Sequence, residues 1–228
     1  MDTLPNELEN VIKDYVIFKP KTNDELQEAV EIWCDNKAKA LNKYGHISIW
    51  DTILITDMSK LFYGKKDFND NINNWNVSNV TKMIDMFGQA KSFNQPLDLW
   101  DVSSVIFMCL MFDGAISFNQ PIGSWDVSSV FDMKYMFYEA TSFNQPLNSW
   151  EVISVTNMEK MFSEASSFNQ PLDSWDVSGV SEMFSMFYGA KSFNQPLNSW
   201  DVSSVTDMLY IFCYTPSFDR SSNAPWSI

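Results

Sequence analysis

The sequence predicts an α/β protein: a curved solenoid with short parallel strands on one face, short helices on the other, and a helical cap at its N-terminus. Three observations support this prediction. The chain repeats itself every 25 residues, each copy has a segment of period two around a tryptophan, and each then continues with helical spacing. Because one such unit cannot bury its apolar faces alone, consecutive units must stack.

The repeat is defined by residues that recur at a constant distance. The tetrapeptide FNQP begins at Phe93, Phe118, Phe143, Phe168 and Phe193. Tryptophans recur at the same distance from Trp50 to Trp200, and each copy should bury its tryptophan and phenylalanine. We therefore expect an N-terminal helical cap over residues 1–45, a repeat solenoid of about seven coils over 46–213, and a C-terminal cap over 214–228.

The pattern inside one copy predicts a strand followed by a helix. Trp125 and Val127 alternate across Asp126, as in a strand with one buried face. The positions that follow at steps of three and four are Val130, Met133, Met136, Phe137 and Ala140. This spacing predicts a helix with Ser129 as its N-cap. The proline of the Asn-Gln-Pro segment, residues 119–121, predicts a loop that closes the coil.

Two further features concern the ends and the loops. Thr22 and Glu25 have the spacing of a capping box and predict an amphipathic helix that ends near Gly45. The asparagine that follows the phenylalanine of each repeat recurs through the array, and stacked amides there are expected to form a structural ladder. The ladder positions are Asn69, Asn94, Asn119, Asn144, Asn169 and Asn194.

The repeat also resembles a known family. Leu97, Trp100 and Val102 have the L-x-x-L-x-L spacing of a leucine-rich-repeat strand. The unit FNQPLxxWDVSxVxxMxxMFxxA, over residues 44–218, is similar to the repeat of the BspA-like leucine-rich-repeat surface proteins. This resemblance implies an atypical leucine-rich solenoid, and relatives of this kind are commonly secreted adhesins. Because no signal peptide or anchor is recognisable, an intracellular or virion-associated protein is expected instead, with an adhesin as an alternative.

Charge and composition exclude several classes of function. A net charge of −14 disfavours nucleic acid and anionic membranes, which are bound by Lys and Arg. Membrane insertion would need about 20 consecutive apolar residues, which the chain lacks. A single histidine, His46, and the absence of catalytic or cofactor motifs predict a protein that is not an enzyme and carries no cofactor or metal. The prediction is a non-catalytic interaction or scaffold protein with a protein partner.

The N-terminal segment leaves another function open. The stretch LPNELENVIKDYV, residues 4–16, resembles the opening of an F-box, which docks an adaptor of ubiquitin ligases. An F-box-like substrate adaptor is therefore a second alternative. The simpler interpretation is a short amphipathic helix that packs on the cap.

Two surfaces are candidates for the partner. At positions that differ between copies, an apolar group occupies sites that elsewhere carry polar residues: Ile106, Phe107, Leu110, Phe131 and Tyr135. Such a group indicates a partner surface, or else a local adjustment of the core. An acidic strip follows the tryptophans: Asp101, Asp126, Glu151, Asp176 and Asp201. These carboxylates either accept hydrogen bonds from nearby serines and backbone amides or attract a basic ligand.

Overall fold

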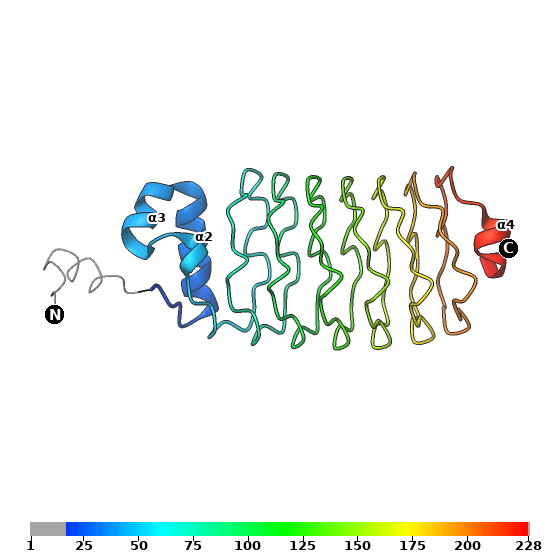
Figure 1. Ribbon diagram of the computed structural model, residues 1–228, viewed down its shortest axis with the longest axis horizontal. Helices are drawn as coiled ribbons and strands as arrows, with labels where there is room; N and C mark the ends of the chain where they lie inside the picture. Colours follow the sequence, from blue (N-terminus) through cyan, green and yellow to red (C-terminus); the bar gives the residue numbers. More distant parts are fainter. Residues whose placement is uncertain (1–16, 228) are drawn as a thin grey trace, which may run out of the picture.

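The computed structural model describes residues 17–227, which form a stack of coils between two helical ends (Figure 1). Six isolated parallel bridges join residues 25 apart, from Asp57 to Asp207, and so link seven coils. We number the coils one to seven, from residues 43–67 to residues 193–217. The helical elements are α2 (Asn23–Asp35), α3 (Lys37–Tyr44), the 3₁₀ turn η1 (Ile47–Ile49), α4 (Arg220–Asn223) and the 3₁₀ turn η2 (Pro225–Ser227).

The α/β prediction is wrong. No strand forms within residues 17–227, because each coil contributes only one bridge residue to each neighbour. The segments around Trp125 and its equivalents were expected to pair as parallel strands, but turns bound them on both sides. Their contact with the neighbouring coil comes from side chains, as when Trp125 Nε1 donates to the carbonyl of Leu97 at 3.0 Å.

The predicted repeat helices are also wrong, because the coils share their backbone amides. In coil four, four N–H groups donate to carbonyls 24 residues later, in coil five: Met133, Tyr135, Phe137 and Glu139. The N–H groups between them, such as that of Met136, donate three residues back and close turns. An α-helix instead needs every N–H to bond four residues back. Left-handed residues, Tyr135 with φ 59° and Glu139 with φ 54°, interrupt any helix.

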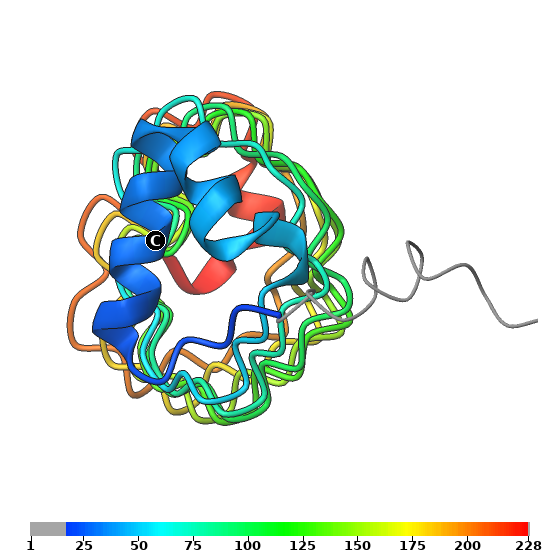
Figure 2. The same ribbon diagram turned by 90° about the vertical axis from the view of Figure 1, so that its left-hand side faces the viewer.

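The predicted curvature is wrong for the same reason. Curvature was expected from helices that are bulkier than the strands on the opposite face. The coils instead follow one another along a nearly straight line (Figure 1), and from the end of the stack their outlines largely superpose (Figure 2). Without helices, the distance between neighbouring coils is set on both sides of the array by hydrogen bonds or stacked side chains. Neither side is therefore longer than the other.

The core consists of rows of identical side chains that run along the stack. As predicted, the tryptophans of the repeats are buried, with Trp125 and Trp150 only 4% and 2% exposed. Phenylalanines stack between neighbouring coils, as for Phe137 with Phe143, with centroids 4.1 Å apart, and for Phe137 with Phe162, at 5.5 Å. Aromatic stacking adds to the burial of large apolar area. The repetition of the sequence therefore builds one continuous core.

The asparagine ladder is confirmed. The Asn144 Oδ1 accepts the Asn169 N–H at 2.9 Å and the Gln170 Nε2 at 3.0 Å, and the same pair of bonds recurs from coil to coil. Each amide thus satisfies the backbone and side chain of the next FNQP segment.

Replacing Asn144 with alanine is expected to lower the free energy of unfolding by about 1–3 kcal/mol, because two half-buried donors lose their acceptor. Chemical denaturation of the full chain measures this change. Asn74→Ala is the matched control, since Asn74 is exposed, and it should stay within about 0.5 kcal/mol of the wild type. Equal effects of the two substitutions would contradict the ladder.

The helical ends cover the stack. As predicted, Thr22 caps α2, and its Oγ1 accepts the Glu25 N–H at 3.2 Å. The expected single helix is divided at Asn36, which ends α2 and caps α3, and Gly45 then ends α3. At the other end, Trp226 Nε1 donates to the carbonyl of Leu197 at 3.0 Å, in line with the tryptophan row.

Candidate functional site

The apolar group predicted from the sequence lies on coils three and four. Ile106 and Phe131 form an exposed pair, 41% and 49% accessible, and the Phe131 N–H donates to the Ile106 carbonyl at 2.9 Å. Phe107 is a half-buried bridge residue between Lys82 and Asp132. The other two members, Leu110 and Tyr135, are half-buried left-handed residues at equivalent positions of the two coils.

The acidic strip has hydrogen-bond donors within its own turns. Asp126 Oδ1 accepts the Ser128 N–H at 3.0 Å and the Ser128 hydroxyl at 2.6 Å. The same arrangement occurs at Asp101 and Asp176, and the Ser203 N–H binds Asp201 in the same way. The serine hydroxyl is the largest cause that lowers the pKa of Asp126, Asp176 and Asp201. These contacts support a structural role for the strip, although Glu151 has no equivalent serine.

A second aromatic surface lies on coils four, six and seven. We call it the tyrosine surface, and it consists of Tyr135, Tyr138, Phe184, Tyr188, Tyr210 and Tyr214. Its rings contact one another in pairs, with centroids 5.5 Å apart for Tyr135 and Tyr138, and 5.1 Å for Tyr188 and Tyr214. Tyr210 and Tyr214 are 58% and 75% exposed, so much of this aromatic area faces solvent.

Within the tyrosine surface is a hollow of about 270 Å³. Its lining residues are Tyr138, Lys160, Ser163, Glu164, Phe184, Ser185, Tyr188 and Tyr210. The hollow exists because coils five and six have serines where neighbouring coils have larger residues. Ser163 stands one repeat from Tyr138 and one repeat from Tyr188, and Ser185 stands one repeat from Tyr210. Both serines are buried and form the base of the hollow.

Of this surface, the sequence prediction contained Tyr135 alone. The available signal was a comparison of equivalent positions in successive repeats, which shows tyrosine, serine, tyrosine at residues 138, 163 and 188. A small residue between two large ones at constant spacing indicates a gap in a row of side chains. Apolar residues that depart from the repeat do not reveal such a gap, because the residues that form it are small and polar.

Three carboxylates act on Tyr138, and one of them, that of Glu164, lines the hollow. Burial raises the pKa of Tyr138 to about 12, and Glu139, Asp113 and Glu164 add to the rise. The one lysine in the lining, Lys160, has its Nζ 5.0 Å from the ring centroid of Tyr135 and 5.6 Å from that of Phe184. The lining therefore combines aromatic faces and buried hydroxyls with one carboxylate, Glu164, and one ammonium group, Lys160, which lies over aromatic rings.

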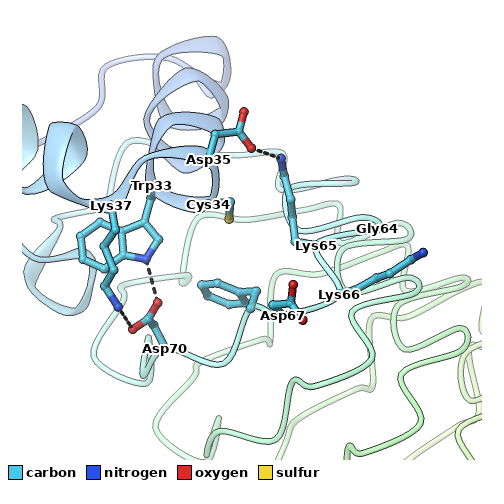
Figure 3. A pocket seen from close by; sticks show the side chains of 10 residues that line it. Trp33, Cys34, Asp35, Lys37, Gly64, Lys65, Lys66, Asp67 and Asp70 are labelled. Atoms are coloured by element: carbon cyan, nitrogen blue, oxygen red, sulfur yellow. Dashed lines mark hydrogen bonds and ion pairs between the residues drawn. The ribbon is translucent and has the colours of Figure 1, made fainter.

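A larger hollow, of about 610 Å³, separates the helical end from the first coils (Figure 3). Four of its charged residues, Asp35, Lys37, Lys65 and Asp70, make contacts between the helical end and the stack. Lys65 Nζ pairs with Glu31 at 2.5 Å, and Asp70 accepts hydrogen bonds from Lys37 Nζ at 2.7 Å and Trp33 Nε1 at 2.8 Å. Burial raises the pKa of the Cys34 thiol in this hollow to about 11. The thiol is thus protonated at neutral pH and is a poor nucleophile.

A pair of acidic side chains lies between coils two and three. Asp85 is only 7% exposed, and its Oδ1 has no hydrogen-bond partner within the described residues. Burial, followed by the charge of Asp113, raises its pKa to about 6. Gly88 leaves room for this carboxylate, since a Cβ there would lie 1.8 Å from Oδ1. The pKa of Asp113 is also raised by burial, while Gln89 Nε2 donates to it at 3.2 Å.

Residues 17–227 contain no group of three or more His, Cys, Asp or Glu side chains placed to hold a metal ion. His46 caps the turn η1, where its side chain accepts the Ser48 N–H. Among the described helices, none has the length and apolar character of a membrane span.

Comparison with known proteins gives one match. A family model described as "Mycoplasma protein of unknown function, DUF285" matches residues 34–148 and 119–226, which together include all seven coils. Neither the curated proteins nor the solved structures include a match to this chain. The tyrosine surface and its hollow lie within the matched residues.

Proposed function

The chain belongs to the DUF285 family, whose function is unknown, and from this premise we propose that it is a non-catalytic protein that binds a protein partner through the tyrosine surface. The observation that carries the proposal is the exposure of clustered aromatic rings on a rigid framework. Tyrosines are enriched at the centres of protein interfaces, where they bury large area at low entropic cost.

The framework supports this role. Hydrogen bonds between coils hold the backbone at every second residue of the turn segment, so the side chains between them project from fixed positions. The core rows repeat with few changes, whereas the surface positions differ from coil to coil. A rigid array with variable surface residues suits recognition, because little conformational freedom is lost on binding. The resemblance of the FNQP unit to BspA-like repeats remains a prediction and agrees with a binding role.

Two alternative functions make different predictions. The F-box-like adaptor depends on residues 4–16, which lie outside the described residues, so its test is loss of adaptor binding after substitution of Leu4 and Pro5. An adhesin would bind a partner on another cell surface. The absence of catalytic activity is part of our proposal and is motivated by the sequence, in which no nucleophile and base motif occurs.

Site-specific photo-crosslinking tests the proposed surface. Benzoylphenylalanine placed at Tyr210 in the full chain should form a crosslinked adduct with the protein partner in cells that naturally contain this protein. The reason is that this exposed residue belongs to the tyrosine surface. The same group at Leu99, which is 65% exposed on another part of the coil, is the control and should give no adduct of that mass. Adducts at Leu99 alone, or at neither position, would contradict the proposal.

A further inference from the structure

We propose that the hollow in the tyrosine surface binds an arginine side chain of the protein partner. This inference rests on the proposed function and adds the chemistry of what is recognised. Three properties carry it: the width of the gap over Ser163, the aromatic faces around it, and the carboxylate of Glu164.

The width follows from the repeat. Tyr138 and Tyr188 belong to coils four and six, and coil five contributes only the hydroxymethyl group of Ser163 between them. Hydrogen-bonded neighbours lie about 4.8 Å apart, so two coils separate the tyrosine positions by about 10 Å. A side chain that contacts both walls needs a distance of about 8 Å between them, because each of its two contacts takes about 4 Å. The gap therefore fits one extended or planar side chain.

The aromatic walls favour a cation. Lys160 already places its ammonium group over the rings of Tyr135 and Phe184, which shows that rings of this surface accept a positive charge at contact distance. The remaining rings of the lining, Tyr138, Tyr188 and Tyr210, carry no such cation among the described residues. A guanidinium group suits a two-walled gap better than an ammonium, because it is flat, weakly hydrated and stacks on aromatic faces.

Glu164 supplies the opposite charge. Its carboxylate lines the hollow, is half-buried and forms no ion pair within residues 17–227. Gly189 gives it space, since a Cβ there would lie 2.5 Å from the Glu164 Cδ. A guanidinium group can bind such a carboxylate through two parallel hydrogen bonds. The net charge of −14 also favours a basic partner segment.

The binding test uses the full chain with ¹³C-labelled tyrosine rings and a short probe peptide, acetyl-Gly-Gly-Arg-Gly-Gly-amide. Addition of this peptide should shift the ring signals of Tyr138 and Tyr188 in a saturable manner. The same peptide with citrulline, which has the shape of arginine without its charge, should bind at least about tenfold more weakly, and so should the lysine peptide. Equal binding of the citrulline peptide, or shifts confined to other tyrosines, would overturn the proposal.

Two variants locate the site. Ser163→Tyr should fold normally, because coils four and six have tyrosine at this position, and should fill the gap without changing the charge. Glu164→Gln removes the carboxylate, and both variants should weaken binding at least about tenfold. Ser167→Tyr, at an exposed position of the same coil that does not line the hollow, is the control and should bind as the wild type does. Unchanged binding by a Ser163→Tyr variant with a normal thermal transition would overturn the proposal.

The protein interface and the arginine site can be tested separately. If the Tyr210 crosslink to a partner persists in Ser163→Tyr and the Arg peptide does not bind, the tyrosine surface is the interface but the arginine assignment is wrong. If the Arg peptide binds as described but no partner is crosslinked at Tyr210, the arginine site stands and the proposed interface is wrong.

Discussion

Replacing Trp150 with alanine is expected to lower the free energy of unfolding by about 3–5 kcal/mol. The indole is buried and stacks on Trp175 with centroids 6.4 Å apart, and it also lies 6.4 Å from the ring of Phe137. Its Nε1 donates to the carbonyl of Ile122 at 3.0 Å. The substitution would leave a cavity in coil five that coils four and six border. It would also leave the Ile122 carbonyl without its donor, and both effects are destabilising.

Equilibrium denaturation of the full chain measures this loss. Tyr214→Ala is the control, because Tyr214 is 75% exposed and its truncation should cost no more than about 0.5 kcal/mol. Trp150→Phe should fall between the two, since it keeps part of the stacking but loses the hydrogen bond. A loss below about 1 kcal/mol for Trp150→Ala would contradict a close-packed tryptophan row.

The buried rows could be predicted from the sequence because burial follows directly from the repeat. A constant distance of 25 residues places equivalent side chains in successive coils, whatever the local backbone conformation is. The conformation itself was not determined by that pattern. Steps of three and four residues arise both in a helix and in consecutive turns that each bury one side chain, so Met133, Met136 and Phe137 fit either structure.

A local signal distinguished the two conformations. Gly64, Gly114 and Gly189 occupy one repeat position, and each has a positive φ, between 61° and 69°. Glycine at that position in three coils indicates a left-handed residue inside the predicted helix. A left-handed residue and a glycine both disfavour the interior of a helix. The other left-handed position could not be recognised, because its occupants include Leu110, Tyr135 and Lys160.

The candidate site was less accessible to sequence reasoning than the core. The predicted apolar group assumed that function lies where apolar residues replace polar ones. The hollow instead depends on Ser163 and Ser185, which are small residues in rows of larger ones. Phe184 and Tyr210 border the same gap. This proximity depends on the turn geometry, which decides which rows of side chains are neighbours on the surface, and the repeat alone does not determine it.

Stability should depend on pH through Asp85. Its pKa is about 6 in the folded protein and 3.8 as its ordinary value, so the folded state holds this proton more tightly than the unfolded state does. The contribution of Asp85 to the free energy of unfolding should therefore fall as the pH rises from about 4 to 6, and one pKa unit corresponds to about 1.4 kcal/mol. The ionised carboxylate thus costs on the order of 3 kcal/mol above pH 6.

Asp85→Asn should remove this cost. The variant should be more stable than the wild type at pH 8 by up to about 3 kcal/mol, and equally stable near pH 3.5. Asparagine also suits the left-handed backbone of this residue, whose φ is 59°. Thermal or chemical denaturation of both proteins across this pH range measures the difference between their free energies of unfolding. The contributions of other titratable groups largely cancel in this difference.

Asp126→Asn is the matched control. The pKa of Asp126 is lowered by Ser128, so its charged form is favoured in the folded state, and neutralisation should slightly destabilise the protein at pH 8. A wild type whose stability rises between pH 4 and pH 6 relative to Asp85→Asn would contradict the burial of an uncompensated charge at Asp85.

The most direct test of the central claim, that the hollow in the tyrosine surface binds an arginine side chain, is the measurement of intermolecular nuclear Overhauser effects between the arginine probe peptide and the full chain. We expect contacts from the arginine δ-methylene protons to the rings of both Tyr138 and Tyr188, because these rings form opposite walls of one hollow. Contacts to rings at the helical end instead, such as Trp33 and Phe68, would contradict the claim, as would the absence of contacts to either tyrosine.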